Sequence, residues 1–253
     1  MGFCRFLQTN AWREGAGTLV ATSEALALPA AATKDTDRTF VWRSLSQVGD
    51  QSLIRDLGVA TAATFAGIAN LKRQNGGDVE LYEGGTGGSP SWNLVGAFPA
   101  QDDDTRLSTL FFDSISARHW KIQWTNGGAA DYAEAGYIGL GTMFEPSRLC
   151  QVPIDWTPID PSILRTSVDG QVSVTTRTRY AVGGLSFLSI NESDLTTFRS
   201  MQRSLGRKTP FFFALDTGLS YFQWLMRFSS DPKYTRRHVP GRYNVEFDWE
   251  ESR

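Results

Sequence analysis

The side chains that most often carry catalysis are scarce in this chain. Its 253 residues include two histidines and two cysteines, at His119, His238, Cys4 and Cys150. No serine or cysteine nucleophile motif accompanies His119, so we expect a surface histidine rather than a general base. Carboxylates are plentiful, but no spacing marks a pair with the separation that glycosidic cleavage uses. The sequence therefore predicts a protein that is not an enzyme and has no catalytic residue.

Two short stretches could hold an ion. Residues 84–90 read GGTGGSP, and bare backbone amides can wrap an anion, but the stretch lacks the Gly-Lys-Ser/Thr end of a phosphate loop. We expect a flexible loop between strands. Residues 102–104 are three aspartates that could offer oxygens to calcium, but the alternating ligand spacing is absent and a solvated turn is favoured. Two cysteines exclude a thiolate cluster, so neither a metal nor a cofactor is predicted.

A basic cluster near the carboxyl end could bind a partner. It joins four cations, a histidine and two tyrosines, at Lys233, Arg236, Arg237, Arg242, His238, Tyr234 and Tyr243. Arginine pairs with carboxylates in a bidentate manner, and arginine and tyrosine are enriched in protein interfaces. We therefore expect a subunit interface at Arg236, Arg237, Arg242 and Tyr234. A solvated loop and a nucleic-acid site are the alternatives.

Composition and charge limit the classes of partner. A hydrophobic content of 41% and an aromatic content of 12% are typical of a folded chain. The 25 Lys and Arg residues nearly balance the 27 Asp and Glu residues, so no global field indicates nucleic acid or an anionic membrane. No stretch resembles a secretory signal or is long enough to span a membrane, so we expect synthesis in a cytoplasm and no membrane insertion.

The elements that must position these residues are mostly strands. In residues 118–124, Trp120, Ile122 and Trp124 share one face, and residues 243–250 alternate in the same way. Turn-forming glycines separate further short apolar stretches, which predict strands at 17–22, 40–44, 64–71, 78–83, 137–141, 171–180, 185–190 and 211–216. One helix is expected from a cap at Asn191 or Ser193 to a stop at Gly206.

Prolines divide the chain into parts. Four of them, at Pro146, Pro153, Pro158 and Pro161, fall within a stretch that lacks sustained periodicity. They predict a β-sandwich over residues 1–145, a proline-rich connector over 146–165, and a smaller β-rich assembly domain with one helix over 166–253. The first part is acidic, whereas the last is mildly basic and rich in aromatic residues. The predicted fold class is therefore all-β.

Landmarks in the first part occur in an order that resembles a known family. They are LPAAA at 28–32, VWRS at 41–44, IRDLG at 54–58, IANL at 68–71, ARHWKI at 117–122 and YIGLG at 137–141. The order resembles the discoidin-like branch of the galactose-binding fold, an eight-stranded jelly-roll β-sandwich. The resemblance implies that Trp42 fills the sandwich and that Trp120 lies on a central strand. Such residues specify packing rather than a ligand.

The same resemblance implies where a sugar could bind. Discoidin-like carbohydrate binders hold their ligand in loops at one end of the sandwich, where aromatic side chains stack on sugar faces. Tyr82 and Trp92 flank the glycine-rich loop at residues 84–90. They are therefore the candidate glycan contacts, since loops on a rigid scaffold often carry function.

The combination of this sandwich with a short aromatic-rich region resembles minor tail and distal-tail or tail-tip proteins of long-tailed bacteriophages. The features are SVDG at 167–170, the capped helix, FFFALD at 211–216 and a final strand that ends in two glutamates. The resemblance implies a structural component of a tail tip or baseplate in the virion, assembled as a trimer or hexamer with other tail proteins. The alternative is a glycan-binding adhesin or receptor-binding module that uses loops of the sandwich.

Overall fold

A computed structural model describes residues 4–36, 40–74, 76–86, 90–100, 107–128, 130–151, 154, 156–166, 169, 171–176, 179–215 and 223–252. The chain forms two compact units. The first contains Met1–Glu145 and Phe211–Trp224, and the second contains Pro146–Pro210 and Leu225–Arg253. Among the described residues, no helix combines the length and apolar character needed to cross a membrane.

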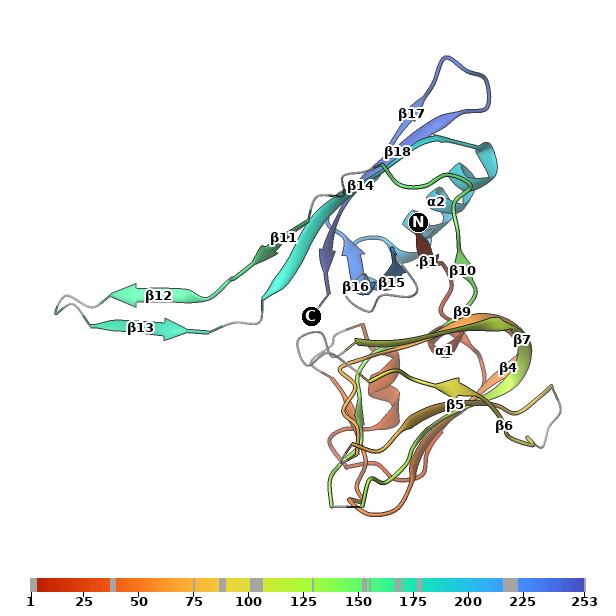
Figure 1. Cartoon of the computed structure of the whole chain (residues 1–253), viewed down its shortest axis with the longest axis vertical. Helices are drawn as coiled ribbons and strands as arrows, with labels where there is room; N and C mark the ends of the chain where they lie inside the picture. The colour runs from red at the N-terminus through yellow and green to blue at the C-terminus, as the bar shows by residue number, and fades with distance from the viewer. Residues whose placement is uncertain are drawn as a thin grey trace. The chain divides into compact units, whose positions relative to one another are not determined.

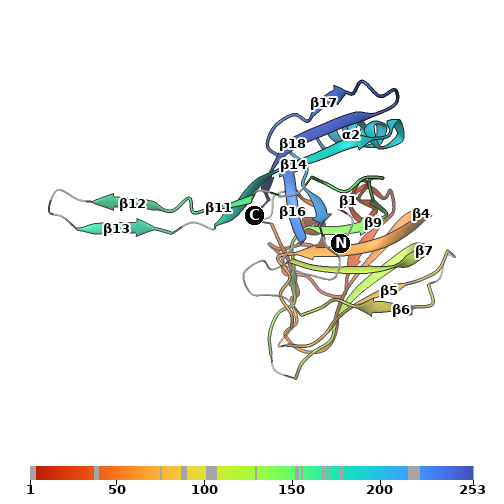
Figure 2. The same ribbon diagram turned by 45° about the horizontal axis from the view of Figure 1, so that its top comes forward.

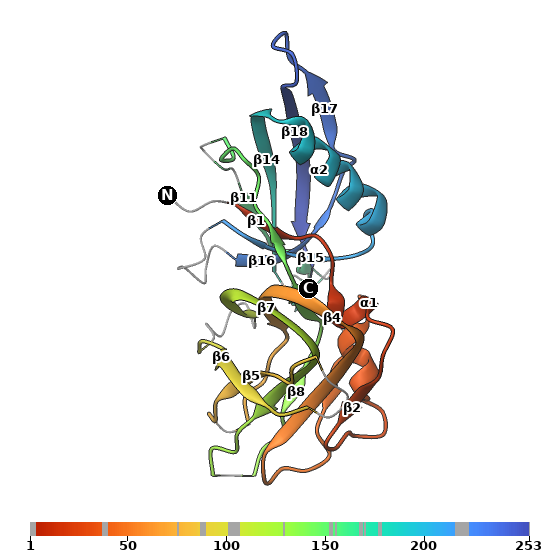
Figure 3. The same cartoon turned by 90° about the vertical axis from the view of Figure 1, so that its right-hand side faces the viewer.

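One large antiparallel sheet forms most of the first unit. Its strands lie in the order β2 (Leu19–Ala21), β4 (Gln51–Ala69), β7 (Leu107–Trp124), β5 (Val79–Glu83) and β6 (Asn93–Ala97), and β9 (Ile138–Gly141) also pairs with β4. The long strands β4 and β7 shift register at two places, as expected of β-bulges. Both strands curve markedly (Figure 3).

Short elements cover the inner face of this sheet. They are α1 (Ala11–Glu14), the 3-10 helix η1 (Ala30–Lys34), and a pair of strands formed by β3 (Trp42–Arg43) and β8 (Glu134–Ala135). Trp42 and Trp124 meet in the core with ring centroids 5.0 Å apart. Trp120 is fully buried on β7, as its alternation with polar residues predicts.

A second group of strands completes the first unit. The strand β1 (Arg5–Leu7) pairs with β10 (Met143–Phe144) on one side and with β15 (Phe211–Ala214) on the other. The rings of Phe6 and Phe213 pack with centroids 4.9 Å apart. The segment Phe211–Trp224 therefore belongs to the first unit, although the boundary expected from the prolines leaves it in the second domain.

The second unit is a sheet with a helix on one face (Figure 1). At its edge, β11 (Trp156–Ile159) pairs with β14 (Tyr180–Ile190), and β14 pairs in turn with β18 (Tyr243–Glu251). The other side of β18 pairs with both β16 (Gln223–Phe228) and β17 (Lys233–Arg236). The helix α2 (Glu192–Leu205) packs Phe198 against Phe187 and Phe247. Two further strands, β12 (Ile163–Thr166) and β13 (Val172–Thr175), pair only with each other in the described sheets.

The all-β class and the single long helix are confirmed. The Asn191 side chain caps α2 by accepting a 2.8 Å hydrogen bond from the Asp194 amide, and Gly206 follows the last turn with φ of 55°. The stretch at 146–165, expected to be a proline-rich connector, contains β11 and the start of β12. Pro158 is tolerated within β11 because β11 is an edge strand, where a missing amide hydrogen leaves no internal bond unmade.

Candidate functional site

The outer face of the large sheet gathers the polar residues of β5 and β7. Alternation turns Trp120, Ile122 and Trp124 into the core and sends Lys121 and Gln123 to the opposite face. Strand register then places Tyr82 directly opposite Lys121, and Glu80 opposite Gln123. The residues of this cluster, which we call the β5–β7 site, are Asp50, Glu80, Tyr82, Trp92, Lys121 and Gln123.

Two aromatic rings flank the Lys121 ammonium at this site. Its Nζ lies 4.1 Å from the ring centroid of Tyr82 and 5.2 Å from that of Trp92. Both distances are within the range of cation–π attraction. The Lys121 Nζ also donates a 2.8 Å hydrogen bond to Gln123 Oε1. Burial lowers the pKa of Lys121, and the carboxylates of Glu80 and Asp50 act in the opposite direction.

Hydrogen bonds link the polar members of the site. The Tyr82 hydroxyl donates to Glu80 Oε2 at 2.7 Å, and this bond, with burial second, raises the pKa of Tyr82 to about 12. The Gln123 Nε2 donates to Asp50 Oδ2 at 3.1 Å. The face therefore offers hydrogen-bonded carboxylate oxygens, an amide and one ammonium beside two rings. Such a mixture of apolar area and convergent polar groups is typical of a small-ligand site.

Glycine and a glutamate position Trp92. A side chain at Gly84 would place its Cβ 3.0 Å from the Trp92 ring and 2.6 Å from Pro90 Cβ, so only glycine lets the loop close here. Glu83 holds both ends of this loop, because one carboxylate oxygen accepts from the Gly85 amide at 2.5 Å and the other accepts from Asn93 Nδ2 at 2.7 Å. The middle of the loop, residues 87–89, lies outside the described residues.

The expectation of a surface histidine at position 119 is wrong. His119 is 6% exposed, because the Gly84 backbone lies over it, and a Cβ at Gly84 would be 2.9 Å from His119 Cβ. His119 Nε2 lies 3.7 Å from Asp56 Oδ2, beyond hydrogen-bond length. Asp56 is instead held by Arg118, which donates two hydrogen bonds of 2.8 Å. His119 Nδ1 has no hydrogen-bond partner among the described residues, so nothing there marks a nucleophile–base pair.

The structure places the four expected interface residues in the second unit. Tyr234 is half-buried, donates to Gln202 Oε1 at 3.0 Å and lies under Arg199. Arg242 donates to the Ser189 carbonyl at 3.2 Å, and Arg237 to the Ser189 hydroxyl at 2.8 Å. Arg236 is exposed. Three of the four, Tyr234, Arg237 and Arg242, thus form hydrogen bonds within their own unit, and Arg236 and Arg237 are exposed.

Four members of the β5–β7 site, Asp50, Glu80, Lys121 and Gln123, were not anticipated from the sequence. Lys121 and Gln123 alternate with core residues, which indicates only an exposed face, and the pairing of β7 with β5 is needed to bring them beside Tyr82. Glu80 requires the same register. Residues 102–104, the expected solvated turn, lie outside the described residues. Within the described ranges, no three His, Cys, Asp or Glu side chains gather in a way that could hold a metal ion.

No family model and no curated protein matches this chain. Similar solved structures include the chitosan-binding module 1 of a chitosanase/glucanase from Paenibacillus sp. IK-5, with 17% identity and a TM-score of 0.45 over 52% of this chain and 98% of that module. A Clostridium perfringens module in complex with GalNAc-β-1,3-galactose has 21% identity and a TM-score of 0.41 over 49% of this chain and 94% of its own.

A family 32 carbohydrate-binding module of C. perfringens, in complex with galactose, has 21% identity and a TM-score of 0.39 over 49% of this chain and 91% of its own. At this level of similarity, the ligand of the present chain has to be inferred from its own side chains.

Proposed function

We propose that the first unit binds glycans without chemically altering them, and that it does so at the β5–β7 site. The observation that carries the proposal is the pair of half-buried rings, Tyr82 and Trp92, on either side of Lys121. A pyranose ring has an apolar C–H face and a rim of hydroxyls. Aromatic rings suit the former, and the carboxylates and amide beside them suit the latter.

Lys121 is the cation of this site, and a ligand has to compete with it for the Tyr82 ring. Its ammonium lies over the Tyr82 ring at 4.1 Å, where a sugar would stack. The lysine stem is flexible and its ammonium carries three donors, so a ligand can displace the side chain and gain a donor to a hydroxyl oxygen. Glu80 and Asp50 are held in place by Tyr82 and Gln123 and can accept from other hydroxyls.

The charges at the site favour a neutral sugar over an acidic one. Two carboxylates, from Asp50 and Glu80, act on the Lys121 ammonium at this site. A uronic or sialic acid would bring a further negative charge to them, and like charges repel. We therefore expect neutral glycans to bind, with affinity that changes little between low and high salt.

Calorimetric titration of the whole chain with neutral and acidic oligosaccharides tests this proposal. Trp92→Ala should weaken the binding of a neutral glycan about tenfold or more, because the stacking surface is lost. The matched control is Trp156→Ala, which removes a tryptophan that is 49% exposed in the second unit. If the unaltered chain binds no glycan, or if the two variants bind equally well, the site is not a glycan site.

A second role, as a structural component of a bacteriophage tail tip or baseplate, is supported by the β12–β13 hairpin. Leu164 pairs with Val174, and Val172 lies on the same face, with exposures of 67%, 57% and 58% in that order. A lone two-stranded hairpin is only marginally stable in water, and exposed apolar groups mark contact surfaces. Figure 2 shows this hairpin extending away from the sheet of its own unit.

In this role the chain is part of the virion, in a trimeric or hexameric ring, and the hairpin packs on a neighbouring tail protein. Mass spectrometry of purified virions and electron microscopy with an antibody against the chain test the location. Finding the chain only in the host lysate, and never in particles, contradicts this second role. That result leaves glycan binding by the first unit untouched.

A further inference from the structure

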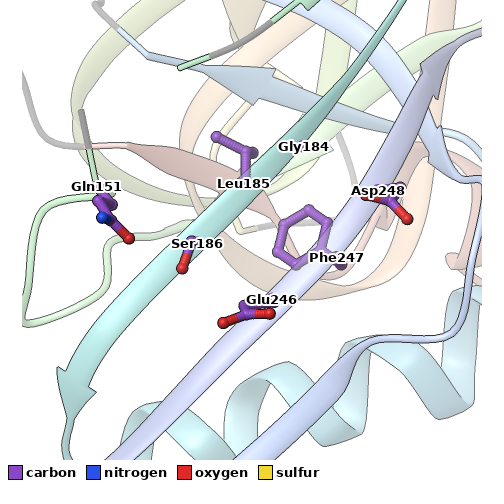
Figure 4. Close-up of a pocket in the computed structure, with 7 residues that line it drawn as sticks. All are labelled: Gln151, Gly184, Leu185, Ser186, Glu246, Phe247 and Asp248. Atoms are coloured by element: carbon purple, nitrogen blue, oxygen red, sulfur yellow. The ribbon is translucent and has the colours of Figure 1, made fainter. Parts of the chain in front are cut away.

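The second unit has a polar pocket on the face of its sheet that α2 does not cover. Figure 4 shows its lining, with Gly184, Leu185 and Ser186 on β14, Glu246, Phe247 and Asp248 on β18, and Gln151 beside them. The cavity volume is about 350 Å³. Since Phe187 and Phe247 pack on Phe198 of α2, alternation puts Ser186, Glu246 and Asp248 on the opposite face.

Two carboxylates dominate this pocket. Glu246 and Asp248 are two residues apart on one strand, which places their Cα atoms roughly 6 to 7 Å from each other on the same face. Both are exposed, and Asp248 accepts a 2.9 Å hydrogen bond from the Ser230 hydroxyl. Lys233 on β17 is the register partner of Glu246. One lysine offsets only one of the two carboxylates, so Glu246, Asp248 and Lys233 together keep a net negative charge. We call Glu246 and Asp248 the acidic pocket.

The tip of the β17–β18 hairpin in the same unit carries the opposite charge. Arg236, Arg237 and His238 are exposed there, and no acidic residue lies between Lys233 and Glu246. The tip is fastened, because Arg237 and Arg242 donate to Ser189 and the Arg237 amide donates to the Arg242 carbonyl at 3.0 Å. We call Arg236, Arg237 and His238 the basic knob. Because these hydrogen bonds hold its backbone in place before binding, less entropy is lost when it binds a partner.

The knob of one chain cannot fill the pocket of the same chain. Arg236 is the register partner of Tyr243, so it lies on the face of the sheet opposite Glu246. Arg237 lies beside Arg242 at the far end of the hairpin, and about 20 Å of strand separates Arg242 from Asp248. The guanidinium groups of the knob therefore do not reach the two carboxylates of their own chain, and a knob from another copy is free to do so.

We propose that the basic knob of one copy of this chain docks into the acidic pocket of the next copy, with Arg236 and Arg237 paired to Glu246 and Asp248. Bidentate pairs between guanidinium and carboxylate give such a contact both direction and strength. The two surfaces are different, so the contact is heterologous and runs head to tail. Repeated contacts of this kind close into a ring or extend as a filament.

A charge-swap experiment on the full chain tests the contact. One variant carries Arg236→Glu with Arg237→Glu, and the other carries Glu246→Lys with Asp248→Lys. Each alone opposes like charges across the contact and should weaken self-association about tenfold or more in sedimentation velocity. An equimolar mixture restores opposite charges in both directions, so it should associate again. Raising the salt from about 50 to 500 mM should weaken the native assembly.

The control is Arg165→Glu with Lys208→Glu, which makes the same charge change at exposed positions of the second unit outside the β17–β18 hairpin. It should associate like the unaltered chain, and melting curves should show all three variants folded. Three outcomes overturn the proposal: a native chain that stays monomeric, charge-swapped variants that associate as the native chain does, or a mixture that stays dissociated. Glycan binding by the first unit is unaffected in each case.

Discussion

A single carboxylate, Asp56 on β4, binds Arg118 on β7, the strand that carries Lys121 and Gln123. It accepts two hydrogen bonds of 2.8 Å from Arg118 and one of 2.7 Å from the Gly58 amide. The bond to Arg118, then that to Gly58, hold the pKa of Asp56 well below its usual range. Arg118 shares a strand with Lys121, so this pair also fixes β7 against β4 beside the site.

We predict that Asp56→Asn removes part of the pH dependence of folding. A carboxyl whose pKa is lowered by folding stabilises the folded state above its unfolded pKa of about 3.9, and this contribution disappears as the pH falls. The variant should therefore be less stable than the native chain at neutral pH, and the difference should shrink below about pH 4. Urea unfolding across this pH range measures it.

Asp113→Asn serves as the control, because Asp113 is an exposed residue of the same strand, β7. This variant removes a carboxylate from β7 and keeps the Arg118 pair, so it separates the loss of that pair from the loss of a negative charge. Parallel curves for Asp56→Asn and the native chain would show that the Arg118 pair contributes nothing to folding.

At the scale of elements, two glycines on neighbouring strands leave the space into which one aromatic ring packs. Gly67 on β4 is the register partner of Gly139 on β9. A Cβ at Gly67 would lie 2.6 Å from the Phe212 ring, and one at Gly139 would lie 2.4 Å from it. Phe212 of β15 thus packs on bare backbone, with Phe65 and Tyr137 at ring-centroid distances of 5.3 and 6.0 Å.

We predict that Gly139→Ala destabilises the chain by about 1 to 3 kcal/mol, because the added methyl group forces Phe212 from its position. Thermal unfolding of the full chain measures the change. The matched control is Gly184→Ala, whose Cβ would meet only Asp248 Oδ1 within 4 Å, at 3.6 Å. Equal melting temperatures for the two variants would contradict this packing of Phe212.

At the scale of the whole molecule, the first unit is discontinuous in sequence. The chain leaves it after Glu145, forms much of the second unit, and returns for Phe211–Trp224. This returning segment supplies Phe212 to the glycine pair and Phe213 to Phe6, and Gln223 forms a hydrogen bond with Thr109. A boundary drawn at residue 145 therefore separates the first unit from part of its own core.

We predict that a fragment of residues 1–145 is poorly folded, because it exposes the apolar surface that Phe211–Phe213 cover. The fragment should bind a hydrophobic dye and melt without a sharp transition, whereas the full chain should not. Adding a linker and residues 211–224 to the fragment should restore a cooperative transition. A fragment of 1–145 that melts as sharply as the full chain contradicts the assignment of the returning segment.

The sequence by itself determined the local features of this protein. The alternation around Trp120 and in residues 243–250 predicts strands with one buried face, because successive side chains point to opposite sides. The cap at Asn191 and the stop at Gly206 predict the limits of α2, because helix ends need local hydrogen-bond partners and a residue that tolerates positive φ. These features depend on near neighbours in the chain.

Tertiary structure decided which distant residues meet. Arg55 is fully buried and donates to the carbonyl groups of Trp12, Gly15 and Gly17, which lie far from it in the sequence. Lys121 reaches Tyr82 and Trp92 only because β7 pairs with β5 in one register, and a shift of one residue would turn Lys121 into the core. Two features depend on packing between residues that are distant in the sequence: the register of β7 with β5, and the position of Phe211–Trp224 in the first unit. The spacing of residues along one strand encodes neither of them.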